Sequence, residues 1–126
     1  MNPERRKPRD IRERCFAFAV LAVKLYRKLL AGTDRAGWAI GRQCVDAATS
    51  VGANEEEAQA AESKNDFIHK NKVALKEARE SIYWLRLMSA AAILPATELA
   101  PLIREADEIV SVITAIIVSA KGGTGR

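Results

Sequence analysis

A long stretch without proline is the feature that most limits what this chain can fold into. The prolines lie near the two ends, at Pro3, Pro8, Pro95 and Pro101, so residues 9–94 contain none. Because proline breaks the interior of a helix, this stretch has room for several long helices. Ala, Leu, Glu, Lys and Arg dominate the chain, and the apolar-polar alternation of a half-buried strand is absent. The sequence therefore predicts an all-α protein.

Length and composition limit the class of protein further. With 126 residues, the chain is long enough for one domain with a core and too short for two. Its content of 48% hydrophobic and 29% charged residues is typical of globular proteins. The apolar run Ile109–Ala120 falls short of the roughly 20 residues that span a bilayer, and no apolar segment directly follows the basic N-terminus. We therefore expect a cytoplasmic protein without membrane contact.

The two cysteines, Cys15 and Cys44, both lie among apolar residues with helical spacing. In a chain without a secretory signal, this placement predicts free, buried thiols in a reducing compartment. A disulfide between them is the alternative.

Apolar residues recur with helical spacing in four segments of the chain. We expect helices over about 10–31, 35–61, 64–93 and 96–120, with Thr33 or Asp34 capping the second and Ser63 capping the third. The apolar stripe of the first helix is Ile11, Cys15, Phe18, Ala22, Leu25 and Leu29. The stripe of the second is Trp38, Val45, Ala48, Val51 and Ala58, and close packing is expected at its Gly41 and Gly52. Short turns join these segments, and four such helices predict an antiparallel up-down-up-down bundle over residues 10–120. A flexible basic arm, 1–9, is expected before the bundle and a flexible tail, 121–126, after it.

The first helical segment carries apolar residues on more than one face. Phe16 and Phe18 point about 160° apart at 100° per residue, so one of them enters the core and the other does not. Large apolar patches are uncommon on monomers. The sequence therefore predicts a homo-oligomer.

Several polar residues fall at positions where an ordinary bundle would place Leu or Ile. The set, with the residues that share its helix faces, is Gln43, Ser50, Asn54, Glu57, Lys70, Glu77, Glu80 and Trp84. Burying such groups costs several kcal/mol unless they are paired. We favour a structural network that fixes helix register or subunit pairing; a ligand or partner surface and a catalytic site are the alternatives.

A metal centre is not expected. Asp66 and His69 have the carboxylate-x-x-His spacing of di-iron bundles, but those sites need a second such motif. This chain has one histidine, so a complete site within one chain is impossible and a solvated His69 is expected. The sequence also lacks a phosphate-cradling glycine loop and a Ser-His-Asp set, so no cofactor is expected.

Positive charge is concentrated at the ends of the chain, although the net charge is only +4. The bases concerned are Arg5, Arg6, Lys7, Arg9, Arg12, Arg14, Lys121 and Arg126. Such bases can neutralise phosphates of RNA or DNA, and a solubilising tail is the alternative. In a bundle with an even number of helices both termini lie at one end, so these bases would form one surface.

Residues 43–91 carry a dense motif. Its parts are the segment Ala47–Asn54 (AATSVGAN), the pairs Glu57-Ala58 and Asp66-Phe67, and the segments Leu75–Glu80 (LKEARE) and Tyr83–Leu87 (YWLRL). This motif resembles the bacterial four-helix bundle family that includes proteins encoded in intervening sequences of 23S rRNA genes. The resemblance implies a left-handed bundle that assembles as a ring-shaped homopentamer, with no established enzyme activity. Accessory variability determinants of diversity-generating retroelements look like the same fold, and they bind nucleic acid and a reverse transcriptase.

Two positions depart from that family pattern. Asp46 stands where similar sequences usually carry a basic residue, and Glu55 stands where they usually carry an apolar or aromatic one. Both changes make the second helical segment more acidic, which argues against contact between that segment and phosphate.

The sequence therefore favours a non-enzymatic homo-oligomeric bundle, a pentamer, that acts as a scaffold associated with RNA or DNA through its basic termini. The alternative is a protein-interaction adaptor whose acidic second helix binds a basic partner protein without nucleic acid. A ferritin-like enzyme is a third and weaker hypothesis.

Overall fold

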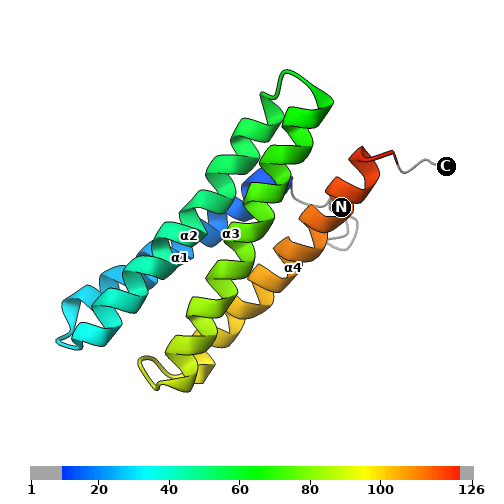
Figure 1. Ribbon diagram of the computed structural model, residues 1–126. Helices are drawn as coiled ribbons and strands as arrows, with labels where there is room; N and C mark the ends of the chain where they lie inside the picture. The colour runs from blue at the N-terminus through cyan, green and yellow to red at the C-terminus, as the bar shows by residue number, and fades with distance from the viewer. Residues whose placement is uncertain (1–9, 123–126) are drawn as a thin grey trace, which may run out of the picture.

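The computed structural model describes residues 10–122 and has four helices. They are α1 (Ile11–Ala31), α2 (Arg35–Gln59), α3 (Lys64–Ala90) and α4 (Ala96–Ala120). No strand occurs in this part of the chain, so the predicted all-α class is confirmed (Figure 1). The predicted arm, 1–9, and most of the predicted tail lie outside the described residues.

Consecutive helices lie side by side, and α4 also contacts α1. The α1–α4 contact is the least extensive of the four, so the bundle is more open along this seam. The start of α1 and the end of α4 lie at the same end of the bundle as the α2–α3 connection (Figure 1). The up-down-up-down order and the left-handed twist stay predictions.

Side chains cap the first three helices. Asp10 accepts a hydrogen bond from the backbone N–H of Arg12, at 2.8 Å, and Asp34 accepts from the first-turn amides of α2. Ser63 accepts from the backbone N–H of Asp66, at 3.0 Å, as its position in the sequence predicts. These caps satisfy amide groups that have no partner within their helix, which fixes where each helix begins.

The end of α3 differs from the sequence prediction by three residues. Ala92 adopts a left-handed backbone with φ 57°. The N–H of Ile93 then bonds to the carbonyl of Met88, and the N–H of Ala92 bonds to that of Ser89. This bonding pattern closes helices in Schellman motifs, where the left-handed residue is usually glycine. The helix therefore stops before Pro95 restricts the chain.

Small residues let α1 and α2 approach closely. A Cβ added at Gly41 would lie 2.6 Å from Cδ1 of Leu29, which is too close for a side chain without movement. At Gly52 the nearest atom would be the Cβ of Cys15, at 3.4 Å, which is ordinary contact. The close packing predicted at these two glycines is thus tight at Gly41.

The core runs the length of the bundle, with Phe18, Leu85, Met88, Leu99, Ile109 and Ile113 among its largest fully buried side chains. Cys15 and Cys44 are free and buried in it, which confirms the predicted thiols. Trp38, which we expected on the apolar stripe of the second segment, is instead 36% exposed. Its indole N–H donates to the backbone carbonyl of Leu29, at 3.0 Å, near the end of α1.

None of the helices within residues 10–122 combines the length and the apolarity needed to cross a membrane.

Candidate functional site

The polar residues that we expected to face the core lie mostly at its edge. Gln43, Glu57 and Glu80 are exposed in the chain, so the expectation that they point into the core is wrong. The other five members of the set are half-buried, namely Ser50, Asn54, Lys70, Glu77 and Trp84. A role for any of them in contacts between subunits stays a prediction.

These residues form short local contacts and not one continuous network. Lys70 donates to Glu57 at 2.6 Å, which joins α3 to α2. Trp84 donates from its indole nitrogen to Glu80 at 3.0 Å within α3. The Asn54 side chain donates to the backbone carbonyl of Ser50 at 2.9 Å within α2. Partial burial, followed by the nearby Glu80 charge, raises the pKa of Glu77.

Three different polar side chains occupy the core. Glu55 of α2 and Asn71 and Ser81 of α3 are each 0% exposed. Ser81 donates to the carbonyl of Glu77, and Asn71 donates to that of Phe67. Among residues 10–122, however, Asn71 Oδ1 and both carboxyl oxygens of Glu55 have no hydrogen-bond partner. Buried polar groups are rarely left in this state, because each one costs about 1–3 kcal/mol or more.

The apolar stripes of the sequence contain the signal for these three positions. Ala48, Val51 and Ala58 leave a gap at residue 55 in a 3-4-3 spacing. The stripe of α3 has similar gaps at residue 71, next to the buried Ala74, and at residue 81, between the buried Ala78 and Leu85. Sequence reasoning treated Glu55 as added surface acidity, although its spacing places it in the core.

Burial changes the acidity of the groups near Glu55. Burial, followed by the nearby Asp10 carboxylate, raises the pKa of the Glu55 carboxyl from 4.5 to about 7. Burial likewise raises the pKa of the Cys15 and Cys44 thiols to about 12. For Cys15, the negative charge of Glu55 is the next cause after burial. Both thiols are therefore poor nucleophiles in the folded chain.

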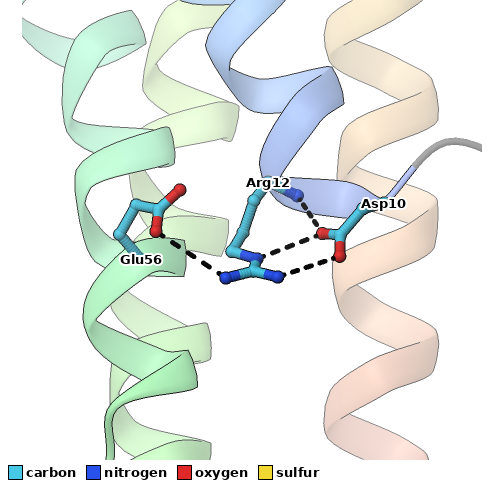
Figure 2. A network of polar contacts seen from close by, with 3 residues as sticks. All are labelled: Asp10, Arg12 and Glu56. Carbon is cyan, nitrogen blue, oxygen red and sulfur yellow. Dashed lines mark hydrogen bonds and ion pairs between the residues drawn. The ribbon is translucent and has the colours of Figure 1, made fainter.

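Arg12, one of the predicted nucleic-acid contacts, is held between two carboxylates (Figure 2). Its guanidinium donates to both oxygens of Asp10, at 3.3 and 3.2 Å, and lies 3.9 Å from a carboxyl oxygen of Glu56. The hydrogen bond to Asp10 raises the pKa of Arg12, and the same bond lowers the pKa of Asp10. Arg12 thus links the start of α1 to α2.

Arg14 is engaged in a similar way. It donates two hydrogen bonds to the Glu105 carboxylate of α4, at 3.1 and 2.9 Å. About a fifth of each of the two side chains is exposed, so water screens this pair less than an open surface pair. The described bases of the predicted N-terminal surface are therefore already neutralised by acids of the chain.

Lys121, at the end of α4, lies next to Lys72 of α3. The Lys121 ammonium, which competes for the same space and repels a second positive charge, lowers the pKa of Lys72, so the two bases lie close together. The remaining predicted contacts, Arg5, Arg6, Lys7, Arg9 and Arg126, lie outside the described residues.

A second apolar face runs along α1, as the phenylalanine spacing predicts. Phe18 is 1% exposed, whereas Phe16 is 71% exposed. Phe16 borders a groove of about 500 Å³ between α1 and α2. Its apolar lining is Phe16, Ala19, Val20, Val23, Gly52 and Ala53. Lys24 and Arg27 also line this groove, together with the Arg12–Glu56 pair.

The acids of residues 46–62 do not form an open acidic surface. Asp46 pairs with Arg42 at 3.3 Å, Glu56 lies beside Arg12, and Glu57 pairs with Lys70. Glu55 is buried, so Glu62 is the one acid of this stretch that is exposed and has no ion pair within residues 10–122.

No cluster of three or more potential metal ligands occurs within the described chain. His69 is exposed on α3, close to the start of the helix.

Comparison with known proteins places the chain in a family. A crystal structure of a protein of unknown function from the S23 ribosomal protein family of Bacteroides thetaiotaomicron VPI-5482 has a TM-score of 0.81 and 32% sequence identity. The match covers 86% of this chain and 98% of that protein. No functionally curated protein matches the chain. The model of one family, described as 23S rRNA-intervening sequence protein, matches residues 9–115, and the chain belongs to this family.

Proposed function

We propose that this protein is a non-enzymatic homo-oligomeric scaffold, a ring-shaped pentamer, that associates with nucleic acid. The observation that carries the assembly is the apolar face of α1. Phe16 is a large aromatic side chain with 71% of its surface exposed, next to an apolar groove. Covering such a face with a second copy removes apolar surface from water, which is the main driving force of stable association.

The charged residues beside the groove favour a specific interface over non-specific hydrophobic association. Lys24 and Arg27 are exposed at the groove and form no ion pair within the described chain. Asp107 and Glu108 of α4 are exposed and likewise free of ion pairs in residues 10–122. Apolar contact between neighbouring copies, framed by opposite charges, would give a head-to-tail interface that closes as a ring.

The nucleic-acid part of the proposal rests on charge. The chain has a net charge of +4, and Lys121, directly after the end of α4, lies beside Lys72 of α3. The family is that of 23S rRNA-intervening sequence proteins, and the similar crystal structure is of a protein from the S23 ribosomal protein family. Because Arg12 and Arg14 are occupied by carboxylates, the contact falls mainly to residues 1–9, Lys72, Lys121 and Arg126.

The adaptor alternative has little support. A basic partner would need unpaired acids on α2, but three of the five acids in residues 46–62 face bases of the chain and one is buried. Those charges are already compensated, so they would attract a partner only weakly.

Light scattering tests the assembly. We expect the wild-type protein at micromolar concentration to have about five times the 13.8 kDa chain mass. Phe16→Asp should lower that mass, because it places a charge on the proposed interface. Tyr83→Asp is the matched control: Tyr83 is 56% exposed on α3, away from the groove, and its replacement should leave the mass unchanged. A wild-type mass of 13.8 kDa would contradict the assembly.

Fluorescence anisotropy with labelled RNA and DNA tests the second part. We expect binding at about 50 mM salt that weakens steeply toward about 200 mM, since phosphate contacts release counterions. Deleting residues 1–9 and 121–126 should abolish it. Binding that is absent at the low salt concentration, or unchanged by the deletion, would rule out the nucleic-acid role and leave the assembly result standing.

A further inference from the structure

We propose that Glu55 is a proton-operated switch: its carboxyl is held neutral in the packed bundle, and loss of the proton releases the start of α1 from α2. This inference concerns the stability of one chain and does not depend on the proposed function.

The position of the carboxyl is the first observation. Glu55 is 0% exposed, and both of its oxygens lack a hydrogen-bond partner among the described residues. A neutral carboxyl without partners costs far less to bury than an ionised one, which loses its hydration with nothing in exchange. Packing of this part of the bundle therefore selects the protonated form.

The groups around Glu55 supply no compensating positive charge. Two helices pack against α2, namely α1 and α3. On the α1 side, the negative Asp10 carboxylate raises the pKa of Glu55, and Glu55 in turn raises the pKa of the Cys15 thiol. Arg12 is close by on α1, but its guanidinium is taken by Asp10 and Glu56 (Figure 2).

Among the described residues, no base of α3 bonds to Glu55 either. The pair between Glu57 and Lys70 fixes the register of α2 and α3, so Glu55 lies near the level of Asn71. Asn71 is neutral and fully buried, and its own carbonyl oxygen has no partner. Of the two nearest bases of α3, Lys70 pairs with Glu57, and Lys72 is exposed beside Lys121.

The start of α1 is the part that yields at the lowest cost. At this end of the bundle, α2 and α3 are joined by the short connection 60–63, whereas α1 joins α2 only at the opposite end. The first turn of α1 is held to α2 by the loose 3.9 Å contact of Arg12 with Glu56. Helix ends open at lower free energy than helix interiors, so water reaches an ionised Glu55 by this route.

The pH range follows from the direction of the shift. Burial raises the pKa of Glu55 from 4.5 to about 7. The folded state thus binds the proton more tightly than the unfolded state, and this group destabilises folding progressively as pH rises from 4.5 to about 7. Above that range the penalty is complete. The difference between the two values corresponds to a roughly 300-fold decrease in the ratio of folded to unfolded protein.

Urea unfolding between about pH 5 and pH 8.5, at one protein concentration, tests the switch. Relative to Glu55→Gln, the folding constant of the wild type should fall by about 70-fold across this range, because the first part of the total effect occurs below pH 5. Glu56→Gln is the matched control, because the Glu56 carboxylate is next to Glu55 in the sequence and is 65% exposed. The Glu56→Gln protein should keep the wild-type pH dependence. If Glu55→Gln and the wild type lose stability in parallel, the proposal is overturned.

A direct titration keeps the proposal testable if the Gln variant does not fold. The carbon-13 shift of the Glu55 carboxyl in the wild-type protein should titrate near pH 7. A midpoint near 4.5, the ordinary value for glutamate, would overturn the proposal.

Thiol reactivity tests whether the opening is local. Cys44→Ser leaves Cys15, which lies near Glu55, and Cys15→Ser leaves Cys44, whose pKa Glu55 does not affect. Each single-cysteine protein is compared with the same protein carrying Glu55→Gln, so that the ordinary rise in thiolate with pH cancels in the ratio of the two rates. Between pH 6 and 8, the rate at which a disulfide reagent modifies Cys15 should rise more steeply with Glu55 than with Gln at this position. Cys44 should show no such difference. An equal response of the two thiols would overturn local release of α1.

Discussion

Arg14 of α1 and Glu105 of α4 form a two-pronged ion pair, with nitrogen-oxygen distances of 3.1 and 2.9 Å. The pair spans the seam where the bundle packs least extensively. Farther along the same seam, Lys28 contacts Glu98 at 2.6 Å. Ion pairs therefore join α1 to α4 at two levels, where apolar contact between the two helices is limited.

Removing the Arg14 guanidinium should weaken this seam. We expect Arg14→Ala to reduce the free energy of unfolding by about 1–2 kcal/mol, more than an open surface pair, because it removes two charge-assisted hydrogen bonds from a partly buried site. The stability of Arg14→Lys should lie between those of the wild type and Arg14→Ala, since lysine keeps the positive charge but cannot donate two parallel hydrogen bonds. Arg79→Ala, at an exposed site on α3, is the control in urea unfolding. A loss no larger than that of Arg79→Ala would contradict a structural role for the pair.

The two phenylalanines of α1 should respond very differently to truncation. Phe18→Ala leaves a cavity in the core and should cost about 3–5 kcal/mol of unfolding free energy. Phe16→Ala removes no core contact and should change the stability of the single chain by less than about 0.5 kcal/mol. Calorimetry at several protein concentrations separates the two, because an effect of Phe16 through assembly varies with concentration. If Phe16→Ala lost as much unfolding free energy as Phe18→Ala at every protein concentration, Phe16 would belong to the core.

Alanine should be tolerated at one glycine of α2 and not at the other. At Gly41 the new Cβ would lie 2.6 Å from Leu29 and 3.0 Å from Tyr26, so we expect a net loss of about 1–2 kcal/mol despite the better helix propensity. At Gly52 the nearest atom is 3.4 Å away, and Ala should add up to about 1 kcal/mol. Thermal melts of the two variants measure the contrast. Similar melting temperatures would mean that Leu29 moves aside freely.

Acid should loosen the start of α1 through Asp10. The hydrogen bond from Arg12 lowers the pKa of Asp10 below 3.8, so its cap is fully present above that value and is lost as pH falls through the lowered pKa. Amide exchange at Arg12 should therefore speed up between about pH 4 and pH 2, beyond its intrinsic pH dependence. In Asp10→Asn, which keeps an acceptor but cannot ionise, that additional change should be missing. Its persistence in the Asn variant would assign it to another group.

Apolar spacing was sufficient to predict the helices and most of the core. The stripe of the first segment, from Ile11 to Leu29, is buried at every expected position. The caps at Asp34 and Ser63 were also visible, because such residues accept from first-turn amides wherever a helix starts. The end of α3 was harder to predict, since it depends on Ala92 adopting a conformation that glycine normally provides.

The burial of the polar side chains was harder to predict, because rotating a helix by one residue about its axis exchanges buried positions for exposed ones. With Trp38 assigned to the buried stripe of α2, Glu57 was expected to face the core and Glu55 was not. In the structure the indole of Trp38 lies at the edge, and Glu55 faces inward. The 3-4-3 spacing around residue 55 was the sequence signal for the observed face, but such a signal is weak when both faces contain small and polar residues.

The bases of the N-terminal region show a further limit. Sequence proximity grouped Arg12 and Arg14 with the basic arm, as one phosphate-binding surface. Arg12 bonds to the neighbouring Asp10, but its second acid, Glu56, and the partner of Arg14, Glu105, are far away in the sequence and are brought close only by the fold. Local charge therefore overstated the positive field at the start of the bundle.

The order in which the helices pair has a consequence for the rate of folding. Three of the contacts join helices that follow each other directly, and the contact of α1 with α4 closes the longest loop in the chain. Such closure costs the most chain entropy and is expected to form after the local pairs. Substitutions in this seam, such as Arg14→Ala, should then accelerate unfolding while leaving the refolding rate nearly unchanged in stopped-flow measurements. The seam would thus set the lifetime of the folded chain, and the three hairpin-like pairs would set how fast it forms.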